Sequence, residues 1–278
     1  MTVTLTCVGF CRQRAWFADR SSFFRFIRFP AMIAIIRHPA LGTLLFDTGY
    51  GRALEESVSA RAYRSMLPFS LPDSERLPAR LVQFGVSRVD RVFLSHFHPD
   101  HIGGLRDVPG VPEILHSRPG LSKLRSLRGV SLRRSAFFAE LLPDDFDARG
   151  RAIEDLPRAV GQASACAELQ LHHLDPGYDI AGDGSLIAIP LPGHAAGQYG
   201  LLCRFPEDGR RLLLCADAAW LRSNIGSDAA RPAWPVRLLV DDYAQFHQTL
   251  DRLDQFARAH PDVRIIPSHC EDSIGPLD

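Results

Sequence analysis

The stretch Ser95-His96-Phe97-His98-Pro99-Asp100-His101 decides how the rest of the chain is interpreted. It places three imidazoles and one carboxylate directly after the apolar run 92–94, which we predict to be a buried strand. Where the chain leaves that strand still extended, alternate residues point the same way, so His96 and His98 share a side. Pro99 favours an extended backbone at His98 and suits the first position of a helix that carries Asp100 and His101. These ligand types indicate a site for zinc or a similar divalent ion, and the alternative is a solvated polar loop.

The composition is that of a globular protein without a strong electrostatic field. A length of 278 residues suits a single large α/β unit, and 46% hydrophobic with 23% charged residues is ordinary for one. The formal net charge of +0 gives no reason to expect nucleic acid or a membrane surface as a partner. The N-terminus alternates like a strand rather than a signal peptide, and no apolar run is long enough to span a bilayer. We therefore expect a cytoplasmic protein.

The six cysteines are scattered along the chain, which argues against a disulfide framework and for a reducing compartment. Cys215 and Cys270 lie close in sequence to candidate ligands, and we expect both to be buried, inert thiols.

The remaining segments predict alternating strands and helices. A hairpin is expected over 31–36 and 43–46, helices over 52–66 and 76–84, and a strand over 113–116. We interpret residues 118–160 as a helical and loop insertion, either a solvated surface or a lid over the substrate. Further strands are expected over 169–174, 185–191, 199–205, 211–216 and 263–266, with a helix capped by Asp241-Asp242 before the last of them.

The segment Trp16–Phe29 is rich in aromatic and arginine side chains. It predicts either a cover for the edge of the core or an apolar wall over a substrate pocket, since pockets are mostly apolar. In the second interpretation Phe24 and Phe26 contact the substrate.

Four more polar residues follow predicted strands. His194 lies in the Pro-Gly-His turn after 185–191, Asp217 follows 211–216, and His269 follows 263–266. The carboxyl ends of strands are where open α/β sheets place their sites. Asp47 follows 43–46 and is either part of a simple turn or a hydrogen-bond acceptor that orients a ligand histidine.

Taken together, these residues resemble the motifs of the metallo-β-lactamase superfamily, in which an Asp after a first hairpin is followed by His-x-His-x-Asp-His, His, Asp and His. The likeness runs from about residue 31 to 271 and fills every position in order. It implies a single α/β domain, a four-layer αβ/βα sandwich with two metals on one edge. By this resemblance His96, His98 and His194 hold one metal, Asp100, His101 and His269 hold the second, and Asp217 bridges them.

The same resemblance implies two divalent ions, zinc by preference, with iron or manganese as alternatives. Such a pair can hold a shared hydroxide and polarise a substrate oxygen, which suits ester, thioester, lactone or phosphoester hydrolysis. Asp100 and Asp217 would be the catalytic residues, with Asp100 able to move a proton. We expect a small-molecule substrate, no nucleic acid and no membrane. The oligomeric state is left open, with a homodimer as one option.

Within the superfamily the chain is most similar to the single-domain lactonases, such as the acyl-homoserine lactonases and pyridoxolactonase, through residues 28–30, 46–50 and 95–98. The tyrosine that assists the substrate carbonyl in the acyl-homoserine lactonases is replaced here by Trp220, which we place in the substrate pocket. We expect hydrolysis of a small carboxylic ester or lactone. A thioesterase, a phosphodiesterase and a non-catalytic metal-binding protein are the alternatives.

Overall fold

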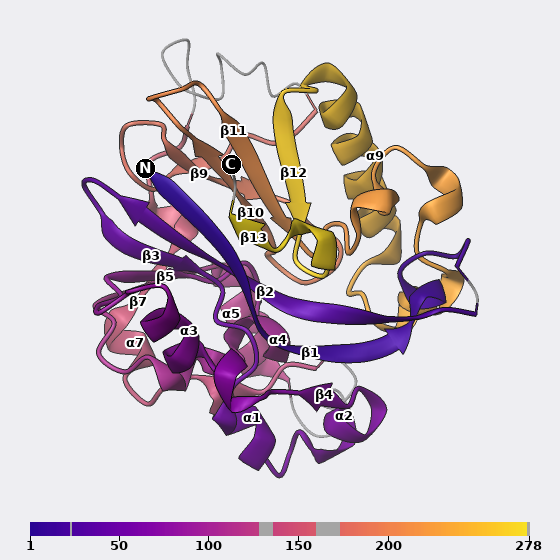
Figure 1. Ribbon diagram of the computed structural model, residues 1–278, viewed down its shortest axis with the longest axis horizontal. Helices are drawn as coiled ribbons and strands as arrows, with labels where there is room; N and C mark the ends of the chain where they lie inside the picture. The colour runs from indigo at the N-terminus through magenta and orange to yellow at the C-terminus, as the bar shows by residue number, and fades with distance from the viewer. Residues whose placement is uncertain (23, 128–135, 160–172, 277–278) are drawn as a thin grey trace.

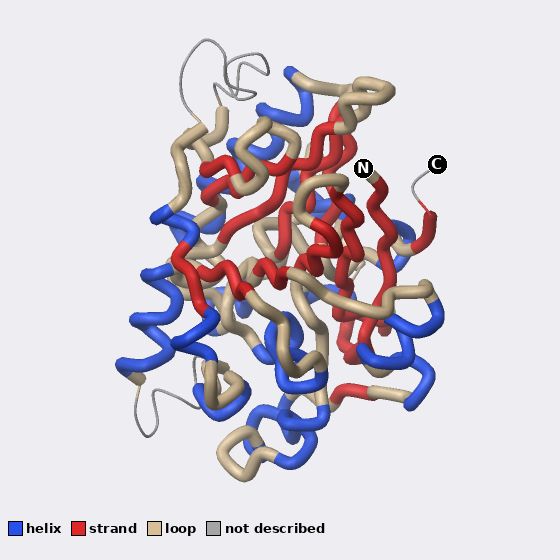
Figure 2. The backbone as a smooth tube through the Cα atoms, turned by 90° about the vertical axis from the view of Figure 1, so that its left-hand side faces the viewer, coloured by secondary structure: helices blue, strands red, loops and turns tan. Residues whose placement is uncertain are grey.

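The computed structural model describes residues 1–22, 24–127, 136–159 and 173–276. Two β-sheets face each other, and helices cover the outer face of each (Figures 1 and 2). This confirms the α/β class and the αβ/βα sandwich that the sequence predicts.

The first sheet has the strand order β13-β1-β2-β3-β5-β6-β7, with β4 paired to β1. Its amino-terminal strands are antiparallel, and β3, β5, β6 and β7 run parallel. Strands β1 and β2 form a long hairpin that reaches past the other strands toward the second half of the molecule (Figure 1). The bounds are β1 Thr2–Arg14, β2 Phe26–His38, β3 Gly42–Phe46, β4 Phe69–Ser70, β5 Arg91–Phe93, β6 Glu113–His116, β7 Gly150–Ala152 and β13 Gly275–Pro276.

The second sheet has the order β12-β11-β10-β9-β8. Only β11 and β12 are parallel among its described pairs, because the long helix α9 carries the chain from the end of one back to the start of the other. The bounds are β8 Tyr178–Asp179, β9 Leu186–Pro190, β10 Tyr199–Arg204, β11 Arg211–Ala216, β12 Val263–Pro267 and α9 Tyr243–Ala259.

The other helices are short. They are α1 Arg52–Glu56, α2 Arg61–Met66, α3 Leu77–Gln83, α4 Pro99–Ile102, α5 Arg118–Ser126 and α7 Phe146–Arg149, with 3₁₀ turns at 15–17, 73–75, 103–107, 139–141, 153–155, 222–224, 228–230, 234–238 and 271–273. Among the described helices, none combines the length and the apolar character needed to cross a membrane.

Three apolar clusters hold the layers together. The central one joins the inner faces of both sheets, for example Phe46 and Phe93 with Leu201 and Leu214. A second packs α1 to α5 on the outside of the first sheet. The third packs the face of α9 that carries Phe246, Leu250, Leu253 and Phe256 on the outside of the second sheet. The apolar faces of the helices and of the strands therefore pack into four layers, helices on sheet on sheet on helices.

Two expected elements differ in the structure. The helix predicted over 52–66 is broken at 57–60, because the Ser57 hydroxyl accepts a hydrogen bond from Ala60 N at 3.0 Å and competes with the helical pattern. The predicted insertion 118–160 contains β7, which extends the first sheet and which three residues of mixed polarity do not signal in the sequence. Most of the strand predicted over 169–174 falls outside the described residues.

Candidate metal centre

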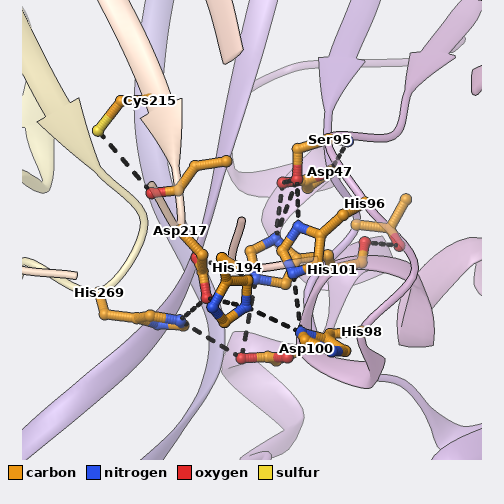
Figure 3. Close-up of polar contacts among 12 residues, drawn as sticks. Asp47, Ser95, His96, His98, Asp100, His101, His194, Cys215, Asp217 and His269 are labelled. Atoms are coloured by element: carbon orange, nitrogen blue, oxygen red, sulfur yellow. Dashed lines mark hydrogen bonds and ion pairs between the residues drawn. The ribbon is translucent and has the colours of Figure 1, made fainter. Parts of the chain in front are cut away.

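The predicted ligands come together where strands of the two sheets end at one edge of the sandwich (Figure 3). The loop after β5 and helix α4 supply His96, His98, Asp100 and His101. The turn after β9 supplies His194, and the residues after β11 and β12 are Asp217 and His269. Most of these side chains are at most 9% exposed, and Asp100 is half-buried. The sites of sheet-based folds are expected at such strand ends.

The backbone of the central motif behaves as its sequence predicts. His98 is extended, with φ −73° and ψ 154°, and it precedes α4, in which Pro99 is the first residue. The first turn then carries Asp100 and His101. The backbone N–H of His101 donates to His98 O at 3.0 Å. Four ligand side chains from one short segment therefore approach the site from two directions.

Two non-glycine residues at the site have a left-handed backbone. Asp47 has φ 60° and Ala216 has φ 49°. Ala216 also marks a register shift between β11 and β12, so the chain turns out of the strand just before Asp217. Such conformations cost about 1–3 kcal/mol each and persist where surrounding contacts impose them. Here they direct two buried carboxylates toward the histidines.

Three imidazole nitrogens converge on one point. Nδ1 of His98 lies 3.0 Å from Nε2 of His96 and 3.0 Å from Nε2 of His194. Burial lowers the pKa of His96 and His194 well below the usual histidine value, so their rings are neutral and carry lone pairs. A cation can accept three converging lone pairs at once, and a single shared proton cannot. This arrangement therefore fits a divalent ion.

The second group surrounds the carboxylate of Asp217. Its Oδ2 lies 3.0 Å from His269 Nε2 and 3.3 Å from His194 Nε2, and its Oδ1 lies 3.3 Å from His101 Nε2. The two oxygens thus face both groups of histidines. Burial opposes ionisation of Asp217, but the charges of His269 and His101 hold its pKa well below the usual range. Asp100 Oδ2 completes the group at 3.6 Å from His269 Nε2 and 3.9 Å from His101 Nε2.

Unpaired buried atoms also fit a metal pair. His101 Nε2 and Asp217 Oδ1 are buried and face each other at 3.3 Å, and neither makes a well-aligned hydrogen bond with any described residue. A cation between them would satisfy both atoms better than this poorly aligned contact does. The ligand atoms form three sets, and within each set they lie within 4.8 Å of one another. The sets are His96-His98-His194, His96-His101-Asp217 and Asp100-His101-His269. The donor set therefore suits two neighbouring ions.

Asp47 lies behind the ligands and contacts them through hydrogen bonds. Its oxygens accept from Ser95 N and Ser95 Oγ, both at 2.7 Å, and Oδ2 lies 2.8 Å from His101 Nδ1. His269 is fixed in the same manner by Pro30 O, 2.8 Å from Nδ1. These partners orient both rings so that Nε2 faces the cluster.

Asp241 is a site residue that the sequence did not reveal, since it was expected only as part of a helix cap. Asp242 is the cap of α9, accepting from Gln245 N at 2.9 Å. Asp241 instead holds the loop that carries His194: its N–H donates to His194 O at 2.9 Å, and its carboxylate accepts from Ala196 N at 2.6 Å. Lys123 Nζ on α5 pairs with the same carboxylate at 2.5 Å.

A cavity of about 310 Å³ opens beside the cluster. Trp220 lines it, as do the ligands His98, Asp100, His194, Asp217 and His269. Its other walls are mainly apolar or aromatic, and no Lys or Arg lines it within the described parts of the chain. Phe17 and Phe29 line it as well and belong to the Trp16–Phe29 segment. The wall residues that sequence reasoning missed are Cys11, Gln13, Tyr50, Tyr63, Met66, Leu67, Ala136 and Leu239.

Phe24 and Phe26 do not line this cavity, contrary to the second interpretation of the Trp16–Phe29 segment. They are 87% and 63% exposed. Successive residues of a strand face opposite sides, so Phe26 and Arg28 point away while Phe29 points inward with Cys11 of the paired strand. Phe29 is buried and meets the ring of His269 edge-on at 6.1 Å. The segment does contribute an aromatic wall, but through Phe17 and Phe29.

Cys215 and Cys270 are buried and free, as expected. Burial raises the pKa of Cys215, whose thiol donates to Ala216 O rather than to the cluster (Figure 3). Among the other described histidines, His38 and His116 are buried outside the metal-ligand groups.

Comparison with known proteins agrees with this geometry. The family model described as the metallo-beta-lactamase superfamily matches residues 28–269. The N-acyl homoserine lactonase AttM of Rhizobium radiobacter is 27% identical over 190 residues, which are 68% of this chain and only 61% of that protein. AttM of Agrobacterium fabrum is 25% identical over 252 residues, 88% of this chain and 83% of that one. An N-acyl homoserine lactone hydrolase solved with N-hexanoyl-L-homoserine at its catalytic metal centre has the same fold, with a TM-score of 0.69, 16% identity and coverage of 98% of this chain and 94% of that one.

Proposed function

Because the chain belongs to the metallo-β-lactamase superfamily, we propose that it is a binuclear metal-dependent hydrolase that cleaves a small carboxylic ester or lactone. The observation that carries the proposal is the position of the His/Asp cluster, which lies beside an apolar cavity without a Lys or Arg in its described lining. Such walls suit an uncharged organic substrate better than a phosphodiester or a large anionic carrier.

In this proposal His96, His98 and His194 hold one ion, Asp100, His101 and His269 hold the other, and Asp217 contacts both. The distances from Asp217 to histidines of both groups support the shared role. Zinc suits the mixture of imidazole and carboxylate ligands, and iron or manganese would be accepted by the same set. When bound, the two ions supply a Lewis acid for the substrate carbonyl and activate water at neutral pH.

The protein groups contribute position and proton transfer. Asp100 lines the cavity, so its carboxylate is in reach of the reacting atoms and can accept the proton of the attacking water. Passing that proton to the oxygen that leaves completes hydrolysis of an ester or opening of a lactone. Phe29 and Trp220 form the cavity wall beside the ligands and limit the access of bulk water.

The test combines metal analysis with a substrate panel. Protein purified without chelator should contain about two equivalents of divalent metal and should hydrolyse esters or lactones in preference to thioesters and phosphodiesters. Asp217→Ala should lose one equivalent and most of the activity while its circular dichroism spectrum stays close to that of the wild type. One equivalent with full activity would disprove the binuclear centre. Cleavage of phosphodiesters or thioesters alone would disprove the substrate class, and metal binding without any turnover would indicate a binding protein.

A further inference from the structure

Gln13 is a polar side chain on the otherwise apolar inward face of the β1–β2 hairpin. Side chains alternate between the two faces of a strand, and the inward neighbours of Gln13 are Cys11, Ile27 and Phe29. Cys11 and Gln13 both line the cavity, whereas Arg12 between them is exposed. The side chain of Gln13 therefore extends toward the space that would hold the substrate.

The carboxamide of Gln13 is accessible and unpaired. Gln13 is half-buried, it makes no hydrogen bond with any of the described residues, and its amide atoms are not enclosed by protein. The other polar wall residues outside the ligand set differ from it. The Tyr50 hydroxyl already interacts with Tyr63 and with the Cys11 thiol, and Nε1 of Trp220 is enclosed. Gln13 thus offers a ligand an acceptor oxygen and two N–H donors.

The register of the hairpin places Gln13 at a distance from the metal ligands. Cys11 is opposite Phe29, whose ring contacts the ring of His269, and Gln13 is opposite Ile27, nearer the end of the hairpin. An antiparallel strand rises about 3.4 Å per residue, so the two residues from Cys11 to Gln13 span about 7 Å. A carbonyl group held at the metal ligands is therefore separated from the carboxamide by a few bonds of the substrate.

We propose that the Gln13 carboxamide binds an uncharged hydrogen-bonding group of the substrate, an amide or a hydroxyl, that lies a few bonds from the carbonyl that is cleaved. The inference rests on the proposed function and adds a specificity-determining residue to it. A purely apolar substrate would remove water from the carboxamide without pairing it, which is unfavourable. A polar site of this kind separates analogues that a hydrophobic wall binds alike. The group is uncharged because no Lys or Arg lines the cavity within the described residues.

Two esters with acyl chains of equal length test the inference by kinetics. They are 4-nitrophenyl 4-acetamidobutanoate and 4-nitrophenyl heptanoate, which differ in one amide, and each rate is corrected for uncatalysed hydrolysis. Gln13→Met keeps the length of the side chain and removes its donors and acceptor. It should lower kcat/KM for the amide ester about tenfold and should not lower that for the heptanoate. Gln248→Met, at an exposed position of α9, should leave both values unchanged. Equal effects of Gln13→Met on the two esters would overturn the proposal.

Binding of the two acids separates this inference from the proposed function. Calorimetry of the metal-loaded protein compares the Kd of 4-acetamidobutanoate with that of heptanoate, since either carboxylate can bind at the metals. The preference for the amide should be about tenfold weaker in Gln13→Met than in the wild type. The same preference in both proteins, or no binding of either acid to the wild type, would overturn the proposal. A wild type that cleaves no ester or lactone would instead reject the proposed function, and the titration would still decide whether Gln13 binds the amide.

Discussion

Asp47 Oδ2 lies 2.8 Å from Nδ1 of His101, and both side chains are fully buried. The contact determines which nitrogen of the imidazole carries the proton, because a carboxylate accepts from N–H. Nε2 of His101 is thereby left with a lone pair toward the cluster, where it makes no well-aligned hydrogen bond with any described residue. Burial opposes a charge here, but the carboxylates of Asp217, Asp100 and Asp47 raise the pKa of His101. They therefore favour a positive charge at Nε2, which a divalent ion bound to that nitrogen would supply.

Replacing Asp47 by Asn should weaken metal binding. Asn tolerates the left-handed backbone at this position, so the main change is the carboxylate. An amide offers one acceptor oxygen for a site that now receives Ser95 N, Ser95 Oγ and His101 Nδ1. We expect metal affinity to fall roughly 10- to 100-fold, measured by competition with a chelator. Asp90→Asn is the control, since Asp90 accepts from Thr43 N at a distance from the cluster. Equal affinities in wild type and Asp47→Asn would show that His101 does not depend on this partner.

Asp241→Ala should loosen the His194 loop without unfolding the chain. The substitution removes the acceptor of Ala196 N and leaves the backbone bond from Asp241 N to His194 O in place. We expect weaker binding of the metal held by His96, His98 and His194, and a loss of activity that added metal partly restores.

Lys123→Met is the matched variant for Asp241→Ala, because it removes the ion pair and keeps the carboxylate. It should have the smaller effect, since the pair is partly exposed and contributes about 1 kcal/mol or less. If Lys123→Met loses as much metal as Asp241→Ala, the ion pair and not the bond to Ala196 positions the loop.

The parts of the site that the sequence revealed are those whose geometry is local. His96, His98, Asp100 and His101 lie within one strand exit and one helical turn, so spacing alone indicates how they converge. His194, Asp217 and His269 follow three separate strands, and only the family likeness ordered them. Strands with apolar runs could be predicted, even β5 with its three residues, whereas the Gly-Arg-Ala of β7 carries no apolar run and was missed.

Which side chains form the wall of the cavity depends on which face of the strand each residue occupies, and composition does not reveal this. The aromatic content of the Trp16–Phe29 segment suggested a pocket, yet which rings face it is set by the register of β2 on β1, including the irregularity between Cys7 and Phe10. Asp241 illustrates the same limit, since a residue next to a helix cap gives no sign of the loop that it binds 45 residues away in the sequence.

Acidification should destabilise the protein partly through His38. Its Nδ1 accepts from Ala40 N and Leu41 N, both at 3.2 Å, so the buried ring is neutral with its proton on Nε2, which donates to Ser185 Oγ at 2.9 Å. Burial lowers the pKa of His38, although Asp183 opposes the shift. In the unfolded chain the histidine pKa is about 6.5, so below that pH the unfolded state binds a proton at His38 more readily than the native state does. The contribution of His38 is therefore full above that pH and is lost as the pH falls through the folded pKa.

Denaturant unfolding of metal-loaded protein between about pH 7.5 and 5.5 measures this effect. His38→Gln cannot take up a proton, so its stability should fall less steeply with acid than that of the wild type. The difference in free energy of unfolding near pH 8, where His38 is neutral in both states, gives the pH-independent cost of the substitution. Parallel slopes for both proteins would mean that protonation of His38 is not linked to unfolding.

Phe29 and Phe26 provide a matched pair on opposite faces of β2. Phe29→Leu removes part of a ring that is 7% exposed, lines the cavity and packs against His269. Because the ring would touch the substrate in the ground state and in the transition state alike, its truncation should raise KM several-fold with a smaller change in kcat.

Phe26→Leu changes a ring that is 63% exposed and lies beneath the Arg14 guanidinium, 5.2 Å from its centroid. It should leave KM unchanged and alter the free energy of unfolding by no more than about 0.5 kcal/mol. The two variants lie in one strand and carry the same chemical change. A difference in KM between them therefore shows that the substrate contacts the inner face of the strand and not the segment in general. If Phe26→Leu raises KM as much as Phe29→Leu, substrate reaches the outer face of the hairpin and the cavity beside the metal ligands is not the whole binding site.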